Sequence, residues 1–599
     1  MKELEVDESF EDLNCFQLTW QSNRMNSQLE DCFYISGDKN GVWWGGGELN
    51  VGGFPLHKSG KVGTSPLVTG DLDQHNWGHI LRHSFISSTG MLISLSPDVT
   101  TNVSINVEEL DKKESSICFS VSATENINPP VLNYSICTTP NISTLHRFMT
   151  SKTKYHKEYI SLMNDANKSS KEIEETVQKI KKQVKDRLEN PVWTPWYPAD
   201  LGNLTEDIVW DYVKKVSALT KKINQKGHIL LPSQWQTKSG SFMFDTTRFP
   251  NINHLTGNIT RLGYQLALTI TPMVDSDSEI FKTGTADGLW VRQYHSSLPV
   301  LTKTNDIVTA AIIDFTNEKS VEWFTHKLNA LKNEYKITRF HILPTLAHDL
   351  PYFHQFKKHI SNPDQTIDIF LSAVTKHSTA ISTEVAIDVP SPPTFMTISE
   401  EGYDGWTSLR SMVNRTLTLS MLGMPLLDTG FIGGGKCKPG YKPSKELYIR
   451  WYQAASYLPA FQMCVLPGEY DKNTKAIILD FATKRKVHVL NKIVPEISNA
   501  IKVGKPLITP LSLMFPNDKE AENIVDQWMI GDYLLVAPIL NEGERSRDVY
   551  LPEGLWKDML DNHIKGGNSW LRNHKVPLTH IGLFRLLKPE GYTDDINER

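Results

Sequence analysis

The first 150 residues alternate apolar and polar positions in short runs. The stretches "MLISLSPDVTTNVSINVEE" (91–109) and "SSICFSVSA" (115–123) show this period of two, and Gly, Asn and Pro separate the runs. Such an alternation is typical of strands with one buried and one solvated face. Residues 1–150 are therefore predicted to form an antiparallel β-sandwich.

The spacing of apolar residues changes at residues 168–190, a segment that is mostly charged. Five apolar residues recur there at helical spacing: Ile173, Val177, Ile180, Val184 and Leu188. One apolar stripe on a charged segment predicts a surface helix that packs on the domain beneath it. Pro191 is expected to end this helix, because proline interrupts helical hydrogen bonding. We assign residues 151–190 to a linker helix.

From residue 191 to 505, apolar runs of strand length alternate with amphipathic segments. The strand candidates are residues 228–232, 264–274, 308–315, 339–343 and 366–374, and the helix candidates are 205–223 and 319–335. This repeated βα pattern predicts a parallel (β/α)8 TIM barrel. Short strands separated by Gly and Pro return from 506 to 599. The expected fold class is thus an α/β barrel flanked by an N-terminal β-sandwich and a C-terminal all-β domain.

Composition excludes several classes of function. The chain has 599 residues, 39% of them hydrophobic, and a net charge of −5. This size supports several domains, and the small charge provides no basic surface for nucleic acid. No run of eighteen apolar residues occurs, so no transmembrane helix is expected. The chain has no CxxC pair with nearby His and no complete P-loop, so neither metal nor cofactor is expected.

Six cysteines stand at positions 15, 32, 118, 137, 437 and 464. The first four fall as two close pairs, each flanking two strands that are adjacent in sequence. We predict disulfides Cys15–Cys32 and Cys118–Cys137, as in an oxidising compartment. Buried free thiols in a cytosolic protein are the alternative. No disulfide partner is predicted for Cys437 or Cys464.

Seven Asn-x-Ser/Thr sites are candidates for glycosylation: Asn102, Asn133, Asn141, Asn167, Asn203, Asn258 and Asn414. About five would occur by chance in so Asn- and Ser/Thr-rich a chain, so the count alone does not establish secretion. The acidic start "MKELEVDESFEDLN" has no apolar segment typical of a signal peptide. We expect an extracellular or lumenal protein whose targeting segment lies outside this chain.

Several stretches in order along the chain resemble glycoside hydrolase family 31. "CFQLTW…LEDCFYISGDKNGVWWGGGE" resembles its myogenesis-regulating glycosidase branch, which is similar to α-galactosidases. "PVWTPW" resembles the first barrel strand, and "FMFDTTRFPN" and "IIDFTNEKSVEWF" resemble segments after strands two and three. "SMLGMPLLDTGFIGGG", "ELYIRWYQAASYLPAFQ", "DQWMIGDYLLVAPIL" and "RDVYLPEGLWKDM" follow in the family's order. The resemblance covers nearly the whole chain.

The resemblance implies a retaining glycosidase site, which needs two carboxylates roughly 5–5.5 Å apart. The family's nucleophile stands in a Lys-Phe-Asp-Ala-Gly-Glu-like strand end. Counted back from a shared Leu-Pro pair, its Lys, Asp and Glu correspond to His341, Leu343 and Leu346. Residues 336–347 contain no Asp or Glu. The nucleophile is therefore predicted to be missing, and Asp349, farther on, is expected to serve a turn or cap.

Other acids of the resembled site are also replaced. The substrate-binding acids after the second strand correspond to Leu230, Pro232 and Ser233, and the family's Arg has no counterpart between positions 376 and 410. The acid/base corresponds to Trp406, although a short gap would place Asp404 there, with Glu400 and Glu401 close by. The acid of a Pro-Asp-x-Ile-Gly-Gly motif becomes Gly430, with Asp428 nearby.

The barrel mouth is predicted to be lined by residues at these positions. The candidates are Trp44, Trp196, Leu230, Pro232, Ser233, Trp235, Thr271, Asp314, His341, Leu343, Asp404, Trp406, Asp428 and Gly430. Trp235 and Trp406 stand where acids are expected and would either stack on sugars or fill the pocket. Trp44 and Glu48 would reach the mouth from the sandwich, or else pack within a Gly-rich hairpin.

The sequence thus predicts a family-31 homologue without catalysis that binds a carbohydrate or protein as an ectodomain. The first alternative is an active α-glycosidase in which Asp404 acts as acid/base and Asp349 or Asp428 replaces the nucleophile. The second is a structural subunit whose pocket is plugged, with Trp406 as the plug. A glycan or protein partner is expected in the first case, and the oligomeric state stays open.

Overall fold

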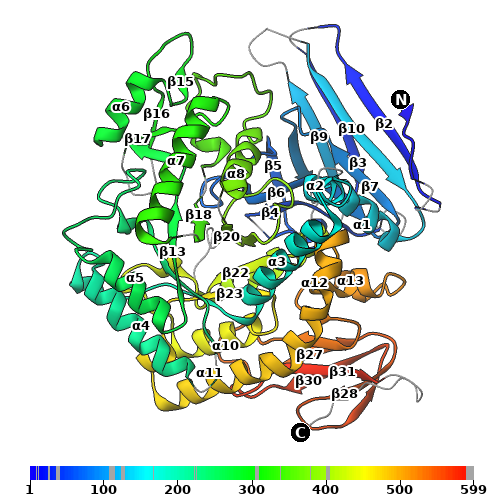
Figure 1. Cartoon of the computed structure of the whole chain (residues 1–599). Helices are drawn as coiled ribbons and strands as arrows, with labels where there is room; N and C mark the ends of the chain where they lie inside the picture. The colour runs from blue at the N-terminus through cyan, green and yellow to red at the C-terminus, as the bar shows by residue number, and fades with distance from the viewer. Residues whose placement is uncertain are drawn as a thin grey trace.

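The computed structural model describes the whole chain except residues 8, 9, 11, 25, 26, 36–40, 51, 107–114, 123–128, 166, 167, 222, 224, 304–308, 338, 344, 378, 400–404 and 588–599. Figure 1 shows a central barrel in green and yellow, with N-terminal strands in blue and C-terminal strands in red and orange beside it. Among the described helices, none is both long and apolar enough to cross a membrane.

Eight parallel strands close the barrel. They are β11 (Val192–Trp193), β12 (His228–Leu231), β13 (Gln265–Ile270), β18 (Arg339–Ile342), β20 (Thr379–Thr383), β21 (Phe395–Thr397), β22 (Leu427–Phe431) and β23 (Ala460–Met463). The last strand pairs with the first, Val192 lying opposite Gln462. Val192, Leu230 and Ala267 form a small buried cluster where three neighbouring strands meet. The predicted TIM barrel is confirmed.

Helices pack around the barrel strands. They include α4 (Glu206–Thr220), α5 (Ile252–Arg261), α7 (Glu318–Tyr335), α9 (Gly405–Met421), α10 (Lys445–Ala455), α11 (Lys472–Arg485) and α12 (Asn491–Val503). Helices α4 and α7 occupy the two segments predicted as helical. The predicted strand at 366–374 is wrong, because this segment lies in helix α8 (Gln365–His377). Its buried residues Ile367, Phe370, Leu371 and Val374 follow the spacing of one helical face, which a short apolar run does not distinguish from a strand.

An insertion between strands β13 and β18 lies beside the barrel and contains a further predicted strand. Residues 309–312 form β17 (Thr309–Ile312), which pairs antiparallel with β14 (Met273–Asp275) and β16 (Leu301–Lys303) and not with the barrel. Helix α6 (Glu279–Asp287) and the small sheet of β15 (Arg292–Gln293) and β19 (His354–Gln355) lie in the same region, at the upper left of Figure 1.

Two antiparallel sheets form the N-terminal region. One runs β1 (Lys2–Glu3), β2 (Asn14–Gln21), β10 (Val131–Thr138), β7 (Met91–Leu95), β6 (Trp77–Ser87) and β4 (Trp43–Leu49). The other runs β3 (Gln28–Tyr34), β9 (Ser116–Ser122), β8 (Asn102–Asn106) and β5 (Val62–Pro66). A hydrophobic core of their own lies between them, as in the predicted sandwich.

The predicted disulfide pairing is wrong. The bonds join Cys15 to Cys137, with Cα atoms 4.1 Å apart, and Cys32 to Cys118, with Cα atoms 4.0 Å apart. Strand β2 pairs with β10 and β3 pairs with β9, so each cysteine lies directly opposite its partner. Strands adjacent in sequence are not adjacent in these sheets, which is why proximity along the chain gave the wrong partners.

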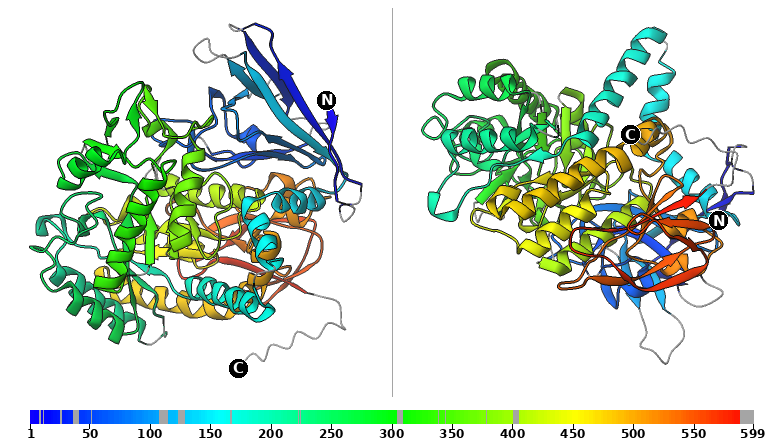
Figure 2. Two further views of the ribbon diagram at one scale, coloured as in Figure 1. Left: turned by 45° about the horizontal axis from the view of Figure 1, so that its top comes forward. Right: turned by 90° about the horizontal axis from the view of Figure 1, so that it is seen from below.

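Three helices connect the sandwich to the barrel: α1 (Ile142–Ser151), α2 (Lys154–Met163) and α3 (Ser170–Glu189). Helix α3 carries the predicted apolar stripe. Ser169 and Glu172 form a capping box at its start, and the helix ends two residues before Pro191. Val184 and Leu188 are buried against the main core. The right view of Figure 2 shows the cyan helices standing beside the barrel.

The C-terminal region is built from strands, as predicted. One sheet runs β24 (Thr509–Pro510), β25 (Trp528–Ile530), β26 (Leu534–Ala537), β31 (Gly582–Leu587), β28 (Leu555–Asp558) and β29 (Ile564–Gly566), and β27 (Ser546–Leu551) pairs with β30 (Ser569–Lys575). The fully buried Arg450 of α10 donates to the carbonyl oxygens of Val576 and His580 and so joins this region to the barrel. The domain limits at residues 150, 190 and 505 stay predictions.

The sandwich also docks directly on the barrel. Ile80 of β6 forms a parallel bridge with Ala386, just beyond β20. The amide of Leu81 donates to the carbonyl of Ala386 at 2.8 Å, and the amide of Ala386 donates to the carbonyl of His79 at 3.1 Å. A sandwich strand therefore continues the barrel sheet at the carboxyl end of its fifth strand.

Candidate functional site at the barrel mouth

The carboxyl ends of the barrel strands form the mouth, which is where TIM-barrel enzymes carry their active sites. At the end of β18, the amide of Leu343 donates to the carbonyl of Ile270 at 2.9 Å. Leu343 is half-buried and Leu346 is buried, and neither side chain offers an oxygen. The carboxylate of Asp349 accepts from the amide of Leu346 at 2.7 Å, so it caps the turn η4 (Ala347–Asp349).

The end of β12 is equally without acids. Leu230 belongs to the buried cluster described above, and Pro232 begins the turn η3 (Ser233–Trp235), in which Ser233 is half-buried. Trp235 is fully buried, its indole N–H donates to the carbonyl of Thr269 at 2.8 Å, and its ring packs on Phe244. This tryptophan fills the interior and offers no exposed face for a sugar.

Asp428 of β22 is fully buried and forms an ion pair with the buried Arg187 of helix α3. Its other oxygen accepts from the amide of Gly430 at 3.0 Å, and Gln462 donates to the carboxylate at 3.1 Å. A buried carboxylate held by three partners in this way serves the structure, because breaking a buried ion pair leaves an uncompensated charge. The geometry does not favour Asp428 as a displaced nucleophile.

The remaining candidates are placed as follows. Asp314 accepts from the Lys357 amide at 2.7 Å and the Thr316 amide at 3.0 Å, and burial raises its pKa. Thr271 is half-buried just beyond β13. Trp44 is fully buried and packs near Phe54. Trp406 is partly buried against the main core. Asp404, Glu400 and Glu401 lie outside the described residues.

Glu384 is a carboxylate at the mouth that sequence reasoning missed. It directly follows β20, and its amide donates to the carbonyl of Ile342 at 3.0 Å, which places it one strand away from Leu343. Its side chain is 25% exposed. The signal was the first of two acids in "ISTEVAIDVP", a stretch without the apolar run of a strand.

His341 holds this carboxylate. Its Nε2 lies 3.0 Å from Glu384 Oε1, and its Nδ1 lies 2.7 Å from the hydroxyl of Ser382. Burial alone would raise the pKa of Glu384, but the hydrogen bond and charge of His341, together with the charges of His79 and Lys436, outweigh it and lower the pKa. Glu384 is therefore ionised at neutral pH.

Glu48 reaches the barrel from strand β4 of the sandwich. One of its oxygens accepts from the amides of His79 and Ile80, and the other accepts from the amide of Ser399 at 2.7 Å. It is fully buried, and burial raises its pKa even though Arg415 and His79 lower it in part. Glu48 thus joins the sandwich to the segment after β21, and Trp44 on the same strand packs in the main hydrophobic core that includes the barrel residues.

A third disulfide, between Cys437 and Cys464, joins the segments after β22 and β23. It holds the turn η5 (Gly435–Cys437), whose exposed Lys436 has a φ of 49°. The sequence gave these cysteines no partner, because the two strand ends meet only when the barrel closes. The disulfide fixes a cation at the same mouth that holds Glu384.

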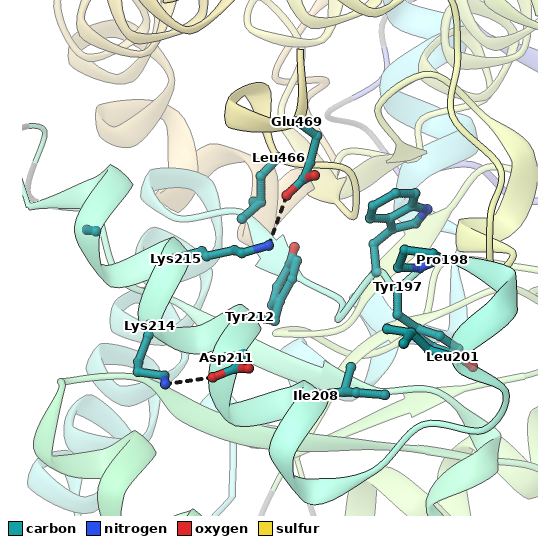
Figure 3. Close-up of a pocket in the computed structure, with 12 residues that line it drawn as sticks. Tyr197, Pro198, Leu201, Ile208, Asp211, Tyr212, Lys214, Lys215, Leu466 and Glu469 are labelled. Carbon is teal, nitrogen blue, oxygen red and sulfur yellow. Dashed lines mark hydrogen bonds and ion pairs between the residues drawn. The ribbon is translucent and has the colours of Figure 1, made fainter. Parts of the chain in front are cut away.

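A separate cavity of about 550 Å³ lies at the rim, between the segments after β11 and β23 (Figure 3). Trp196, Tyr197, Tyr212 and Leu466 are among its lining residues, and Lys215 and Glu469 form an ion pair of 3.1 Å at its edge. The hydroxyl of Tyr212 donates to the carbonyl of Cys464, so the walls offer mainly ring faces and aliphatic surface. Trp196 lines this cavity.

Comparisons with known proteins agree with this architecture. Residues 209–343 match the glycosyl hydrolases family 31 TIM-barrel domain, and residues 504–585 match the glycosyl hydrolase family 31 C-terminal domain. The chain is a homologue of the glycosidases of family 31. A mouse protein named myogenesis-regulating glycosidase is 25% identical over 590 residues, which cover 95% of this chain and 78% of that protein. The SITS-binding protein of Tetronarce californica is 23% identical and covers 98% and 79%, respectively.

Solved structures of the family share the fold. The family-31 dextranase of Flavobacterium johnsoniae, complexed with glucose, superposes with a TM-score of 0.74 at 16% identity, over 96% of this chain and 71% of that one. A family-31 sulfoquinovosidase from E. rectale superposes with a TM-score of 0.71 at 14% identity, over 98% and 89%. At these identities the likeness establishes the architecture, and the chemistry of the mouth has to be argued from this chain's own residues.

Proposed function

We propose that this chain is a family-31 homologue that binds a carbohydrate at the barrel mouth without hydrolysing it. The observation that carries the proposal is the end of β18, where a half-buried leucine stands at the position that the family resemblance gives to the nucleophile. Double displacement needs a carboxylate in line with the anomeric carbon, and Leu343 has no oxygen to supply.

The surrounding groups support this proposal. Leu230 and Trp235 pack in the interior, Asp349 caps a turn and Asp428 is paired with Arg187. Asp349 and Asp428 could reach a sugar only if the backbone that carries them were rebuilt. Misplacement of a catalytic group by about an ångström already costs roughly a hundredfold in rate. The barrel itself is complete, and one relative's name describes a glycosidase while another's describes a binding protein.

We also propose an extracellular or lumenal location. Three disulfides link all six cysteines of the chain, which suits an oxidising compartment. A carbohydrate-binding ectodomain is consistent with this setting.

A second candidate, residual α-glycosidase activity, is favoured by one observation. Glu384 places an ionised carboxylate one strand away from Leu343. It would replace Asp349 or Asp428 as the displaced nucleophile in that alternative. A structural subunit with a plugged mouth is less favoured, because the carboxylate of Glu384 remains partly exposed.

The test is incubation with aryl α-glucosides and α-galactosides and with a mechanism-based fluoroglycoside. We expect no released phenol and no mass adduct on the intact chain, while binding of unsubstituted α-glycosides is detected by calorimetry. A stable adduct that maps to Glu384 would instead establish the second candidate. Absence of both adduct and binding would contradict both functions.

A further inference from the structure

Glu384, which directly follows β20 at the barrel mouth, keeps hydrogen-bond acceptor capacity. Within the described residues, the hydrogen-bond partner of its side chain is His341, which contacts Oε1. An ionised carboxylate offers about four lone-pair sites, so most of its capacity remains. Its side chain is partly exposed, whereas Glu48 and Asp428 are fully buried and satisfied by the protein.

Two buried residues, His341 and Ser382, hold the carboxylate of Glu384 in one orientation. His341 is 4% exposed and Ser382 is fully buried. Nε2 is hydrogen-bonded to the carboxylate and Nδ1 to the Ser382 hydroxyl, so both ring nitrogens of His341 are held in place. The hydrogen bonds therefore run from serine through histidine to glutamate. A buried serine cannot attack a substrate, so this arrangement orients an acceptor and does not form a hydrolytic triad.

We propose that Glu384 recognises the ligand by accepting hydrogen bonds from two neighbouring hydroxyl groups of a neutral pyranoside, with His341 and Ser382 as positioning residues. The inference rests on the proposed function, because it assumes that the mouth binds a carbohydrate. Hydrogen bonds from hydroxyl groups to an ionised carboxylate are short and strong, and two on adjacent carbons fix a sugar ring in the plane of the carboxylate.

The charges around the site favour a neutral ligand. Lys436 is exposed on the turn η5, and its charge together with those of His341 and His79 acts on Glu384. The charge of Lys436 offsets the attraction of the carboxylate for a cationic amino sugar. The carboxylate in turn repels a sugar acid. A neutral sugar meets neither penalty and satisfies the remaining lone pairs of Glu384.

The experiment measures binding of methyl α-glucopyranoside and methyl α-galactopyranoside by ligand-observed NMR and calorimetry. Glucosamine and glucuronic acid serve as charged comparators. Glu384→Gln removes the charge while keeping the shape. Glu469→Gln is the matched control, because Glu469 at the rim cavity has a similar side-chain exposure of 28%, against 25% for Glu384.

We expect Glu384→Gln to weaken binding of a neutral glycoside at least about tenfold, as for loss of a hydrogen bond to a charged group. Glu469→Gln should leave binding unchanged. Equal binding by wild type and Glu384→Gln would overturn the inference and leave the proposed function standing. Failure of the wild-type chain to bind any of the four sugars would overturn the proposed function and the inference together. Preferred binding of glucosamine would overturn the neutral-ligand part of the inference.

The positioning role has its own readout. His341 lowers the pKa of Glu384, so binding that needs the ionised carboxylate should persist to acid pH in the wild type. His341→Leu should raise the pH at which binding is lost, whereas His341→Gln, which keeps a donor, should shift it less. A merely structural role would weaken binding equally at every pH. Thermal unfolding of each variant shows whether the fold is intact.

Discussion

A carboxylate introduced at position 343 would lie on the strand next to Glu384. Leu343→Asp is expected to restore no hydrolysis, because the acids after β12 and the family's Arg are also absent. The new carboxyl would be half-buried beside an existing negative charge, and both effects raise its pKa. A raised pKa destabilises the fold at neutral pH and the cost disappears in acid, where the group is protonated in both states.

The matched control is Leu343→Asn, which has the same shape without the charge. We expect Leu343→Asp to be less stable than Leu343→Asn by about 1–2 kcal/mol at neutral pH, with the difference vanishing below the pKa of a free carboxyl. Chemical unfolding at several pH values measures the difference, and aryl glycosides measure activity. Turnover by the single Asp variant would show that the site lacks only its nucleophile.

At the residue scale, the strand that carries the expected nucleophile position could be predicted. Counting from a Leu-Pro pair located Leu343 and His341 at the end of a real strand, β18. Glu384 was missed because it lies after β20, whose sequence "TAIST" carries no apolar run. Its significance comes from the contact with His341, which no local pattern contains.

At the element scale, the spacing of apolar residues along the chain determined which helices and strands could be predicted. Helix α3 and helix α7 were visible because polar residues separate their apolar positions over many turns. Helix α8 was read as a strand because its apolar residues are nearly continuous, and the following strand was therefore overlooked. Cysteine pairing failed for a related reason, since sheet order is set by the sandwich and not by neighbours in sequence.

The turn η5 provides a prediction at this scale. The disulfide Cys437–Cys464 closes a loop with a sequence separation of 27 and holds Lys436 at the mouth. In the chain-entropy description, such a loop contributes roughly 3–4 kcal/mol. The double variant Cys437→Ser/Cys464→Ser should exchange amide hydrogens faster over residues 434–441 and lose stability. The control is the sandwich double variant Cys15→Ser/Cys137→Ser, which should leave amide exchange over residues 434–441 unchanged. Equal exchange over these residues in the wild type and both double variants would contradict the role given to the Cys437–Cys464 disulfide.

At the scale of the whole molecule, the glycosylation sites differ in whether the asparagine side chain is already engaged in a hydrogen bond. Asn203 is exposed just before helix α4, whereas Asn141 caps helix α1 by accepting from the Ser143 amide at 2.9 Å. Asn258 accepts from Arg261 at 2.9 Å, and Asn167 lies outside the described residues. Expression through a secretory pathway should therefore place a glycan on Asn203 and leave Asn141 unmodified. Peptide mass spectrometry before and after glycan removal checks this, with Asn203→Gln as the control; an unmodified Asn203 in secreted protein would contradict it.

The contact between sandwich and barrel should also set how stability depends on pH. Asp364, fully buried at the start of α8, accepts from the amide of Thr69 at 3.2 Å and from its hydroxyl at 2.7 Å. Thr69 in turn accepts from the amide of Ala347, so this acid joins a sandwich loop to the segments after β18. Burial raises the pKa of Asp364 to about 7, partly offset by the bonds from Thr69.

The direction of the effect follows from proton binding. Between the ordinary pKa of aspartate and a value of about 7, the unfolded chain has lost the proton that the folded chain still holds. Stability therefore falls as pH rises through this interval, by roughly 2–4 kcal/mol for a shift of this size. Asp364→Asn should flatten the slope of the unfolding free energy between pH 4 and 7. Asp98→Asn, which changes an exposed acid at the same contact, should keep the slope. An unchanged slope in Asp364→Asn would show that the carboxyl ionises equally in both states, and that the sandwich holds the barrel without a proton on this acid.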